Sequence, residues 1–296
     1  MKRQKTPIRR TSSLTPIIVL GQNRLGWFGK VRVMAHWFSK APNEQLAGKT
    51  AIIMGGGSGI GKATAQQFAA AGANLMICGV PEQICTDTAE ELRAAGANAI
   101  GMVCDGTKAD QVQAMIDKTL EEFGDIDILI STAGIALPRM NSIDVTEADW
   151  DKIFAVNLKA NFFLATAVAR VMKDKGHGGK MVIISSARGI NSMENIAPYS
   201  ITKAAVMGMV RSLAVDFAGF GIQVNGIAPG YVFTPMVEKV FADNPAQQEY
   251  VYSRTPSKVK MGSLEEMAEA IYFLCSPVTT YTTGQTLILD GGWSIQ

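Results

Sequence analysis

The stretch Thr50-Ala51-Ile52-Ile53-Met54-Gly55-Gly56-Gly57-Ser58-Gly59-Ile60-Gly61 decides the fold of this chain. Its first five residues predict a short, fully buried parallel strand. The glycines after them predict a tight turn, and residues 61–72 predict a helix that ends on a capping glycine. A strand, a glycine turn and a helix in this order aim backbone N–H groups and the positive helix end at a phosphate. We therefore expect an α/β fold with a doubly wound, mainly parallel sheet that binds a dinucleotide.

A second group of polar residues follows another predicted strand, residues 181–184, which ends at Ser185 and Ser186. Thirteen residues after Ser186, Tyr199 opens a predicted helix, and Lys203 stands four residues further on. A separation of four places Tyr199 and Lys203 on one face of the helix. A free tyrosine has a pKa of about 10. A nearby ammonium favours the phenolate and lowers that pKa, so Tyr199 is a candidate general acid or base.

Together, the glycine loop and the serine, tyrosine and lysine resemble the short-chain dehydrogenase/reductase family. The resemblance extends over residues 46–292 and is closest to the short single-domain branch, which is similar to 3-oxoacyl-(acyl carrier protein) reductases. It implies a Rossmann-type domain and an NAD(P)(H)-dependent enzyme that interconverts a secondary alcohol and a ketone by hydride transfer. The small-molecule carbonyl or alcohol would be the substrate. The catalytic residues implied are Asn157, Ser186, Tyr199 and Lys203.

Each of these residues has a role under the resemblance. Tyr199 would move the proton, and Lys203 would also bind the nicotinamide ribose. Ser186 would orient the substrate oxygen and stabilise charge on it. Asn157 would hold a water in a proton relay with the lysine.

The resemblance also implies a set of cofactor-binding residues. Asp105 would accept a hydrogen bond from the adenine amino group, and the segment around Val232 and Thr234 would contact the carboxamide and phosphates. The full set is Gly55, Gly57, Ser58, Gly59, Ile60, Gly61, Gly79, Asp105, Ala133, Gly134, Tyr199, Lys203, Pro229, Gly230, Val232 and Thr234.

The residues after the second predicted strand leave the choice between NAD and NADP open. An acid there would bind the ribose 2′-hydroxyl of NAD, but this chain has Gly79 followed by Val80. The arginine that favours NADP is also missing near Val80, and Ser58 is not basic. The absence of the acid slightly favours NADP(H) over NAD(H).

One turn departs from the family pattern. Where the family has Asn-Asn-Ala-Gly, this chain has Ser131-Thr132-Ala133-Gly134. With the unusual Gly79, this leaves a second hypothesis open: a catalytically silent dinucleotide-binding scaffold or redox sensor.

Residues 235–262 are expected to form a mobile lid over the substrate. The lid is mostly apolar, which favours a carbonyl compound that is not a sugar. Packing of these side chains on the domain is the equal alternative. The apolar residues are Val237, Val240, Phe241, Tyr250 and Val251.

Composition excludes several other classes. Hydrophobic residues make up 47% of the chain and charged residues 18%, which suits a large buried core. The four cysteines show no paired spacing and are expected to be buried free thiols. Only two histidines, His36 and His177, are present, so no metal site is expected. No apolar run approaches the 18 residues of a membrane span.

Residues 1–43 form a basic extension, and residues 44–296 form the catalytic domain. Nine of the 28 Lys and Arg residues lie in the extension, which has no acid, so the rest carries 19 basic against 26 acidic residues. A mildly acidic domain gives no reason to expect nucleic acid as a partner. The extension could be a flexible or non-functional segment, a mitochondrial transit peptide, a basic amphipathic arm, or untranslated sequence if synthesis begins at Met34. We expect a cytoplasmic protein, or one of the mitochondrial matrix if the extension is a transit peptide, and a homotetramer or homodimer.

Overall fold

The computed structural model describes residues 45–295 of the chain, and the structural statements below concern that part. The predictions for the extension, including the start at Met34, lie outside the described residues.

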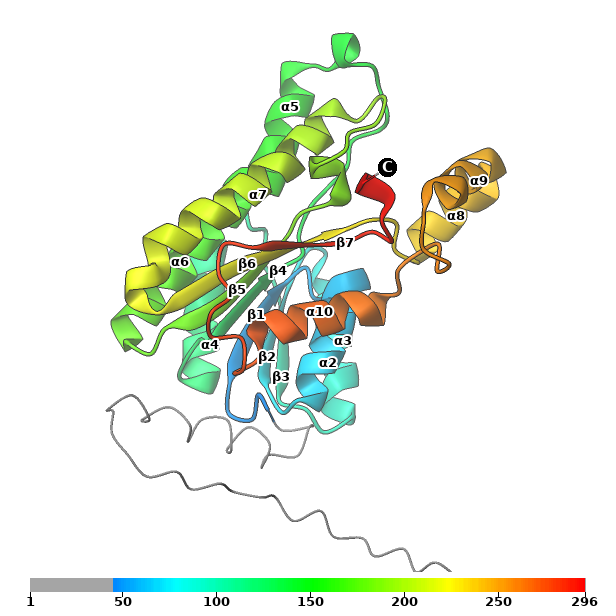
Figure 1. Cartoon of the computed structure of the whole chain (residues 1–296). Coiled ribbons are helices and arrows are strands. Elements are labelled where there is room, and N and C mark those ends of the chain that lie inside the picture. Colours follow the sequence, from blue (N-terminus) through cyan, green and yellow to red (C-terminus); the bar gives the residue numbers. More distant parts are fainter. Residues whose placement is uncertain (1–44, 296) are drawn as a thin grey trace, which may run out of the picture. The chain divides into compact units, whose positions relative to one another are not determined.

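The core is a seven-stranded parallel sheet with the strand order β3-β2-β1-β4-β5-β6-β7 (Figure 1). The order reverses between β1 and β4, and in doubly wound folds ligands bind beyond the carboxyl ends of the strands at such a point. The predicted fold class is therefore confirmed. The strands are β1 (Thr50–Met54), β2 (Asn74–Gly79), β3 (Ala99–Val103), β4 (Ile128–Ser131), β5 (Gly179–Ile184), β6 (Ile222–Pro229) and β7 (Thr286–Leu289).

Helices connect the strands and cover both faces of the sheet, which leaves the loops at the strand ends free for function. Figure 1 shows α8 and α9 on the side of the molecule where the chain ends. The helices are α2 (Gly59–Ala70), α3 (Glu82–Ala94), α4 (Ala109–Phe123), α5 (Glu147–Phe154), α6 (Ala160–Lys175), α7 (Ala197–Phe217), α8 (Pro235–Asp243), α9 (Pro245–Arg254) and α10 (Leu264–Cys275).

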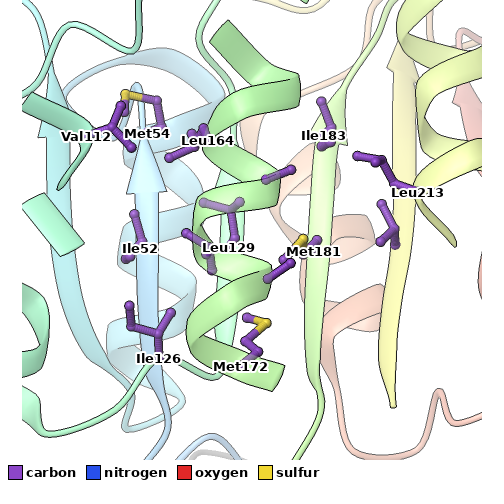
Figure 2. Packing of buried hydrophobic residues seen from close by; sticks show 14 of the residues in the cluster. Ile52, Met54, Val112, Ile126, Leu129, Leu164, Met172, Met181, Ile183 and Leu213 are labelled. Atoms are coloured by element: carbon purple, nitrogen blue, oxygen red, sulfur yellow. The ribbon is translucent and has the colours of Figure 1, made fainter. Parts of the chain in front are cut away.

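Two apolar clusters, one on each face, hold the helices to the sheet. Alternate residues of β1 enter different clusters, because successive side chains of a strand point to opposite faces. Ile52 and Met54 pack with α4, α6 and α7 (Figure 2). Ala51 and Ile53 pack with α2, α3 and α10. Each large aliphatic side chain buried in this way contributes about 1.5–3 kcal/mol.

Two predicted element boundaries were wrong in ways that bear on the site. Helix α2 begins at Gly59, two residues earlier than predicted, with Ser58 at its N-cap. Residues 221–224 of the sequence predict a strand that Asn225 to Gly230 would follow, but β6 runs on to Pro229. The ladder continues because β6 is paired on both sides, with β5 and with β7.

One described helix passes the length and hydropathy test for a membrane span. It runs from Glu147 to Lys175, and its most apolar 18-residue window has a mean hydropathy of 1.2 and is 44% buried inside the protein. The buried side belongs to the core, where Leu164, Val168 and Met172 pack against the sheet. Core helices pass the same test, so the helix is weak evidence for a membrane span.

The cysteine prediction is confirmed. Cys78, Cys85, Cys104 and Cys275 are buried and unpaired, and burial raises the pKa of each thiol. Within residues 45–295, no group of three or more His, Cys, Asp or Glu residues is placed to hold a metal ion.

Candidate active site

Helix α7 packs closely on the loop that follows β5. This contact brings the residues of the candidate active site together. The Ser185 hydroxyl donates a hydrogen bond of 2.7 Å to the Lys203 carbonyl. A Cβ atom on Gly189 would come within 2.7 Å of the Lys203 carbonyl carbon, so only glycine allows the approach. Tyr199 and Lys203 are thereby carried to the end of β5, beside Ser186, as the sequence predicted.

Lys203 is a buried cation. Its side chain is 4% exposed, and its Nζ donates a hydrogen bond of 3.0 Å to the Ile184 carbonyl at the end of β5. The same Nζ lies 5.8 Å from the ring centre of Tyr199. Because burial penalises the charged form, it lowers the pKa of Lys203 to about 8.

The pKa of Tyr199 departs from the expectation that a neighbouring ammonium lowers it. Burial raises this pKa, while the Ser186 hydroxyl and the positive charge of Arg188 act in the opposite direction without cancelling the effect. The reason is that burial next to Lys203 removes the water that would stabilise a charged phenolate, so the neutral phenol is favoured. Tyr199 is therefore a neutral phenol at neutral pH and is ready to give a proton.

Asn157 lies in a single π-helical turn, Ala155–Lys159, between α5 and α6. Such turns occur frequently at functional sites. Its amide is fully used: Oδ1 accepts from the Ile135 N–H at 2.8 Å, and Nδ2 donates to the Ile135 carbonyl at 2.9 Å and to Thr202 Oγ1 at 3.2 Å. Asn157 thus holds the backbone after Gly134 next to Lys203. The water relay expected of Asn157 stays a prediction.

The altered turn after β4 keeps its connections. Thr132 Oγ1 lies 3.0 Å from the Met54 carbonyl and 3.2 Å from the Gly55 carbonyl, which ties the turn to the glycine loop. Ser131 donates to Asn161 Oδ1, and Asn161 Nδ2 donates to the Asn157 carbonyl at 2.9 Å. The hydroxyls thus join β4 to the glycine loop and to the π turn.

The glycine loop offers a cradle for a phosphate. Gly59 has a φ of +51°, and a Cβ atom there would meet no protein atom within 4 Å, so it faces open space at the N-terminus of α2. Gly61 is packed instead, because its Cβ would lie 2.1 Å from the Gly55 carbonyl oxygen. Ser58 makes no capping hydrogen bond with its side chain. Free space at a helix N-terminus fits the pyrophosphate of a dinucleotide.

Two residues at the ends of β2 and β3 lie where the adenosine half is expected. Gly79 ends β2 with a φ of +153°, and a Cβ there would lie 3.4 Å from the Gly55 nitrogen. Asp105 Oδ1 accepts hydrogen bonds from the Thr107 N–H at 2.9 Å and the Thr107 hydroxyl at 2.8 Å. These bonds lower the pKa of Asp105, so it is ionised at neutral pH. Its contact with adenine stays a prediction.

The residues expected around the nicotinamide lie at the end of β6 and just after it. A Cβ on Gly230 would lie 2.7 Å from the Asp290 Cα, which keeps the chain close to the end of β7. Val232 is 6% exposed and pairs with Gly262. Thr234 Oγ1 accepts from the Val237 N–H at 3.3 Å and so helps to begin α8. The cofactor contacts of Pro229, Gly230, Val232 and Thr234 also stay predictions.

Ser186 and Tyr199 open into a cavity of about 330 Å³. Two of the apolar residues of the expected lid, Val237 and Phe241, line it, together with Gln247. Val251 is fully buried and Tyr250 is 45% exposed, and neither lines the cavity. Val237 and Phe241 thus face the cavity, and Val251 packs in the domain. That residues 235–262 form a mobile lid, and that the substrate is not a sugar, stay predictions.

Sequence reasoning missed several residues of this site. The doublet Ser185-Ser186 was a visible signal for Ser185, since both follow the predicted strand. Thr202 lies between Tyr199 and Lys203, and its hydroxyl donates to the Tyr199 carbonyl at 2.7 Å. No local pattern marks the cavity residues Arg188, Tyr231 and Trp293, because distant segments bring them together.

Comparisons with known proteins agree with this geometry. The family model described as enoyl-(acyl carrier protein) reductase matches residues 55–294. The chain is 34% identical over 249 residues to dehydrogenase/reductase SDR family member 4 of Oryctolagus cuniculus, covering 84% of this chain and 95% of the relative. It is 35% identical over 248 residues to a 3-oxoacyl-(acyl carrier protein) reductase of Thermotoga maritima, covering 84% and 98%. A solved gluconate 5-dehydrogenase from Burkholderia cenocepacia, in complex with NADP and tartrate, superposes with a TM-score of 0.80 at 36% identity, covering 85% of this chain and 97% of that one.

Proposed function

Because this chain belongs to the short-chain dehydrogenase/reductase family, as a classical member, we propose that it interconverts a secondary alcohol and a ketone with NAD(P)(H). The observation that carries the proposal is that Ser186 and Tyr199 line one cavity, while the Nζ of buried Lys203 lies 5.8 Å from the ring centre of Tyr199. Relatives at similar identity are dehydrogenases with diverse substrates, among them a 7alpha-hydroxysteroid dehydrogenase of Escherichia coli.

The chain's own residues would handle the proton and the oxygen of the substrate. Bound NAD(P)(H) supplies or accepts the hydride. Ser186 orients the carbonyl oxygen towards Tyr199, and Tyr199 donates its proton as negative charge develops on that oxygen. Since burial raises the pKa of Tyr199, the proton that ketone reduction requires is in place at neutral pH. Lys203 holds a positive charge behind the phenol and stabilises the phenolate left after the transfer.

The residues that would hold the cofactor lie along the carboxyl ends of the strands. The open side of Gly59 fits the pyrophosphate, and Gly79 and Asp105 would flank the adenosine half. Gly134 would border the nicotinamide side, since a Cβ there would lie 3.2 Å from Lys203 Nζ and 3.3 Å from Asn157 Oδ1.

We expect NADPH to bind more tightly than NADH. Gly79 presents no carboxylate to repel a 2′-phosphate, and a solved relative is a complex with NADP. Parallel titrations of the full chain with NADPH and NADH, followed by nicotinamide fluorescence, measure the preference. Tighter binding of NADH would reverse the cofactor assignment. Binding of neither cofactor would contradict the oxidoreductase function itself.

We further propose that the chain forms a homotetramer or homodimer through α5 and α6. Trp150, Phe162 and Phe163 are 40%, 40% and 55% exposed along these helices. They lie on or beside a groove that Phe154, Leu158 and Met209 also line. Phe163→Asp is expected to lower the molar mass measured by light scattering, because a charge in a buried interface is costly. Ile143→Asp, at a residue that is 89% exposed, is the matched control. A monomeric wild type would refute the proposal.

A further inference from the structure

The cavity carries positive charge that its other lining residues do not neutralise. Among the residues that the structure describes, Arg139 and Arg188 line it, and no Asp or Glu does. Among the described residues, Arg188 takes part in no salt bridge. Its Nη2 donates to the Tyr231 hydroxyl at 3.0 Å, whereas Nη1 is buried with no hydrogen-bond partner in the described part of the chain. Arg188 is half-buried, and its buried Nη1 atom lacks an acceptor, so an anion that enters the cavity could complete its hydrogen bonding.

The Arg188 guanidinium is held in place by aromatic rings. Its central carbon lies 3.8 Å from the ring centre of Trp293 and 5.3 Å from that of Tyr231. The Arg254 guanidinium lies 5.4 Å from the same Trp293 ring, and its Nε is also buried without a partner. Stacking of this kind fixes the plane of a guanidinium and leaves its edge free for a planar anion. A second arginine close by strengthens the preference for negative charge.

Arg188 lies next to the groups that handle the proton. It stands two residues after Ser186, and its backbone N–H donates to Ser186 Oγ at 3.1 Å. Its charge also acts on Tyr199. A substrate anion bound by Arg188 would therefore lie close to the reacting carbon. The rest of the cavity is largely apolar, with Leu137, Met140, Met193, Ile196 and Phe241 among its lining.

We propose that Arg188 determines specificity by binding a carboxylate of the substrate. Resting on the proposed function, the substrate class is then an oxo acid, or the matching hydroxy acid, with an apolar chain. The two oxygens of a carboxylate match the paired N–H groups of a guanidinium, and such charge-assisted bonds are about twice as strong as neutral ones. The apolar chain would pack between the loop after β4 and the first turn of α7.

Matched pairs of ketones test this assignment. The probes are 2-, 3- and 4-oxooctanoate, each beside its methyl ester, with saturating NADPH and the full chain. For the pair that fits best, we expect the wild type to favour the acid over the ester by about 100-fold in kcat/KM. Arg188→Met is expected to lose about 100-fold on the acid and less than about threefold on the ester. Arg211→Met, an exposed arginine of α7, is the matched control and should change neither value.

A purely structural role for Arg188 predicts a different result. If the arginine only holds the last turn of the chain through Trp293, Arg188→Met would lower turnover of acid and ester equally, and the proposal would be overturned. If circular dichroism shows that Arg188→Met does not fold, the Arg188→Lys variant is used to test the proposal instead. It keeps the charge without the planar fork, so we expect a loss of about tenfold on the acid alone.

Failure of the proposal and failure of the proposed function give different results. A wild type that reduces esters as well as acids keeps the function and refutes the role of Arg188. If no probe is reduced with either cofactor, the proposed function fails. The role of Arg188 in carboxylate binding is then tested by ligand binding alone. Calorimetry should then show octanoate binding at least about tenfold tighter than octanamide to the wild type, with no difference in Arg188→Met. Equal binding to the wild type would refute the proposal.

Discussion

Replacing Tyr199 by phenylalanine is expected to lower kcat for ketone reduction by about 1,000-fold or more, because general acid catalysis contributes about 100- to 10,000-fold. The change removes only the hydroxyl and keeps the ring that packs near Lys203. Affinity for the cofactor should change by less than about threefold, since the glycine loop is untouched. Steady-state kinetics together with nicotinamide fluorescence titration separate the two effects.

Tyr272→Phe is the matched control for this loss. Its hydroxyl donates to Gln45 at 2.7 Å, away from the cavity, so removing it should leave kcat unchanged. A Tyr199→Phe enzyme that keeps more than a tenth of the wild-type kcat would show that another group moves the proton.

Lys203→Met is expected to abolish activity and to stabilise the fold at pH 7. Burial lowers the pKa of this amine from 10.5 to about 8, and each unit corresponds to about 1.4 kcal/mol. Keeping the buried charge below pH 8 therefore costs about 3 kcal/mol. Methionine removes that cost. Loss of the hydrogen bond to the Ile184 carbonyl lowers the free energy of unfolding by about 1 kcal/mol. The net gain in the free energy of unfolding is about 2 kcal/mol, measured by urea denaturation.

The pH dependence gives the sharper test of Lys203. Between pH 8 and 10.5 the unfolded chain holds a proton on this amine that the folded chain has lost. The free energy of unfolding should therefore rise with pH across this window in the wild type, and less so in Lys203→Met. Lys62→Met is the control, since Lys62 is a surface partner of Glu91. Parallel pH curves for wild type and Lys203→Met would refute the assignment of a buried charge.

Most of the fold could be predicted because its signals are local. The strand, glycine turn and helix at residues 50–72 predict a dinucleotide-binding fold. The structure has these elements in this order, and only the first residue of α2 differs from the prediction. Strand β6 was cut short in the prediction because its continuation depends on tertiary pairing. Asn225 pairs with Val182 of β5, and residues 226–229 pair with β7, some sixty residues further along the chain. Pairing of that kind leaves little trace in the segment itself.

The site was predicted as a set of residues but not as an arrangement. Four-residue spacing is enough to place Tyr199 and Lys203 on one helical face, since the period of the helix is known. The direction of the Tyr199 pKa shift was missed because it depends on how much water the packed helix excludes from the phenol and the amine. The use of the Asn157 amide by the backbone of Ile135 was missed for the same kind of reason, because a π turn decides where that amide points.

What the sequence determined by itself is the family, the parallel sheet and the placement of Tyr199 and Lys203 on one helical face, because each follows from short-range spacing. Only the tertiary structure decided what surrounds them. It brings Arg188 from the loop after β5 against Trp293 from the last turn of the chain, with Arg254 on the same ring. Charge left without a partner is a property of three-dimensional packing, since a counter-ion can come from any part of the chain or from a ligand.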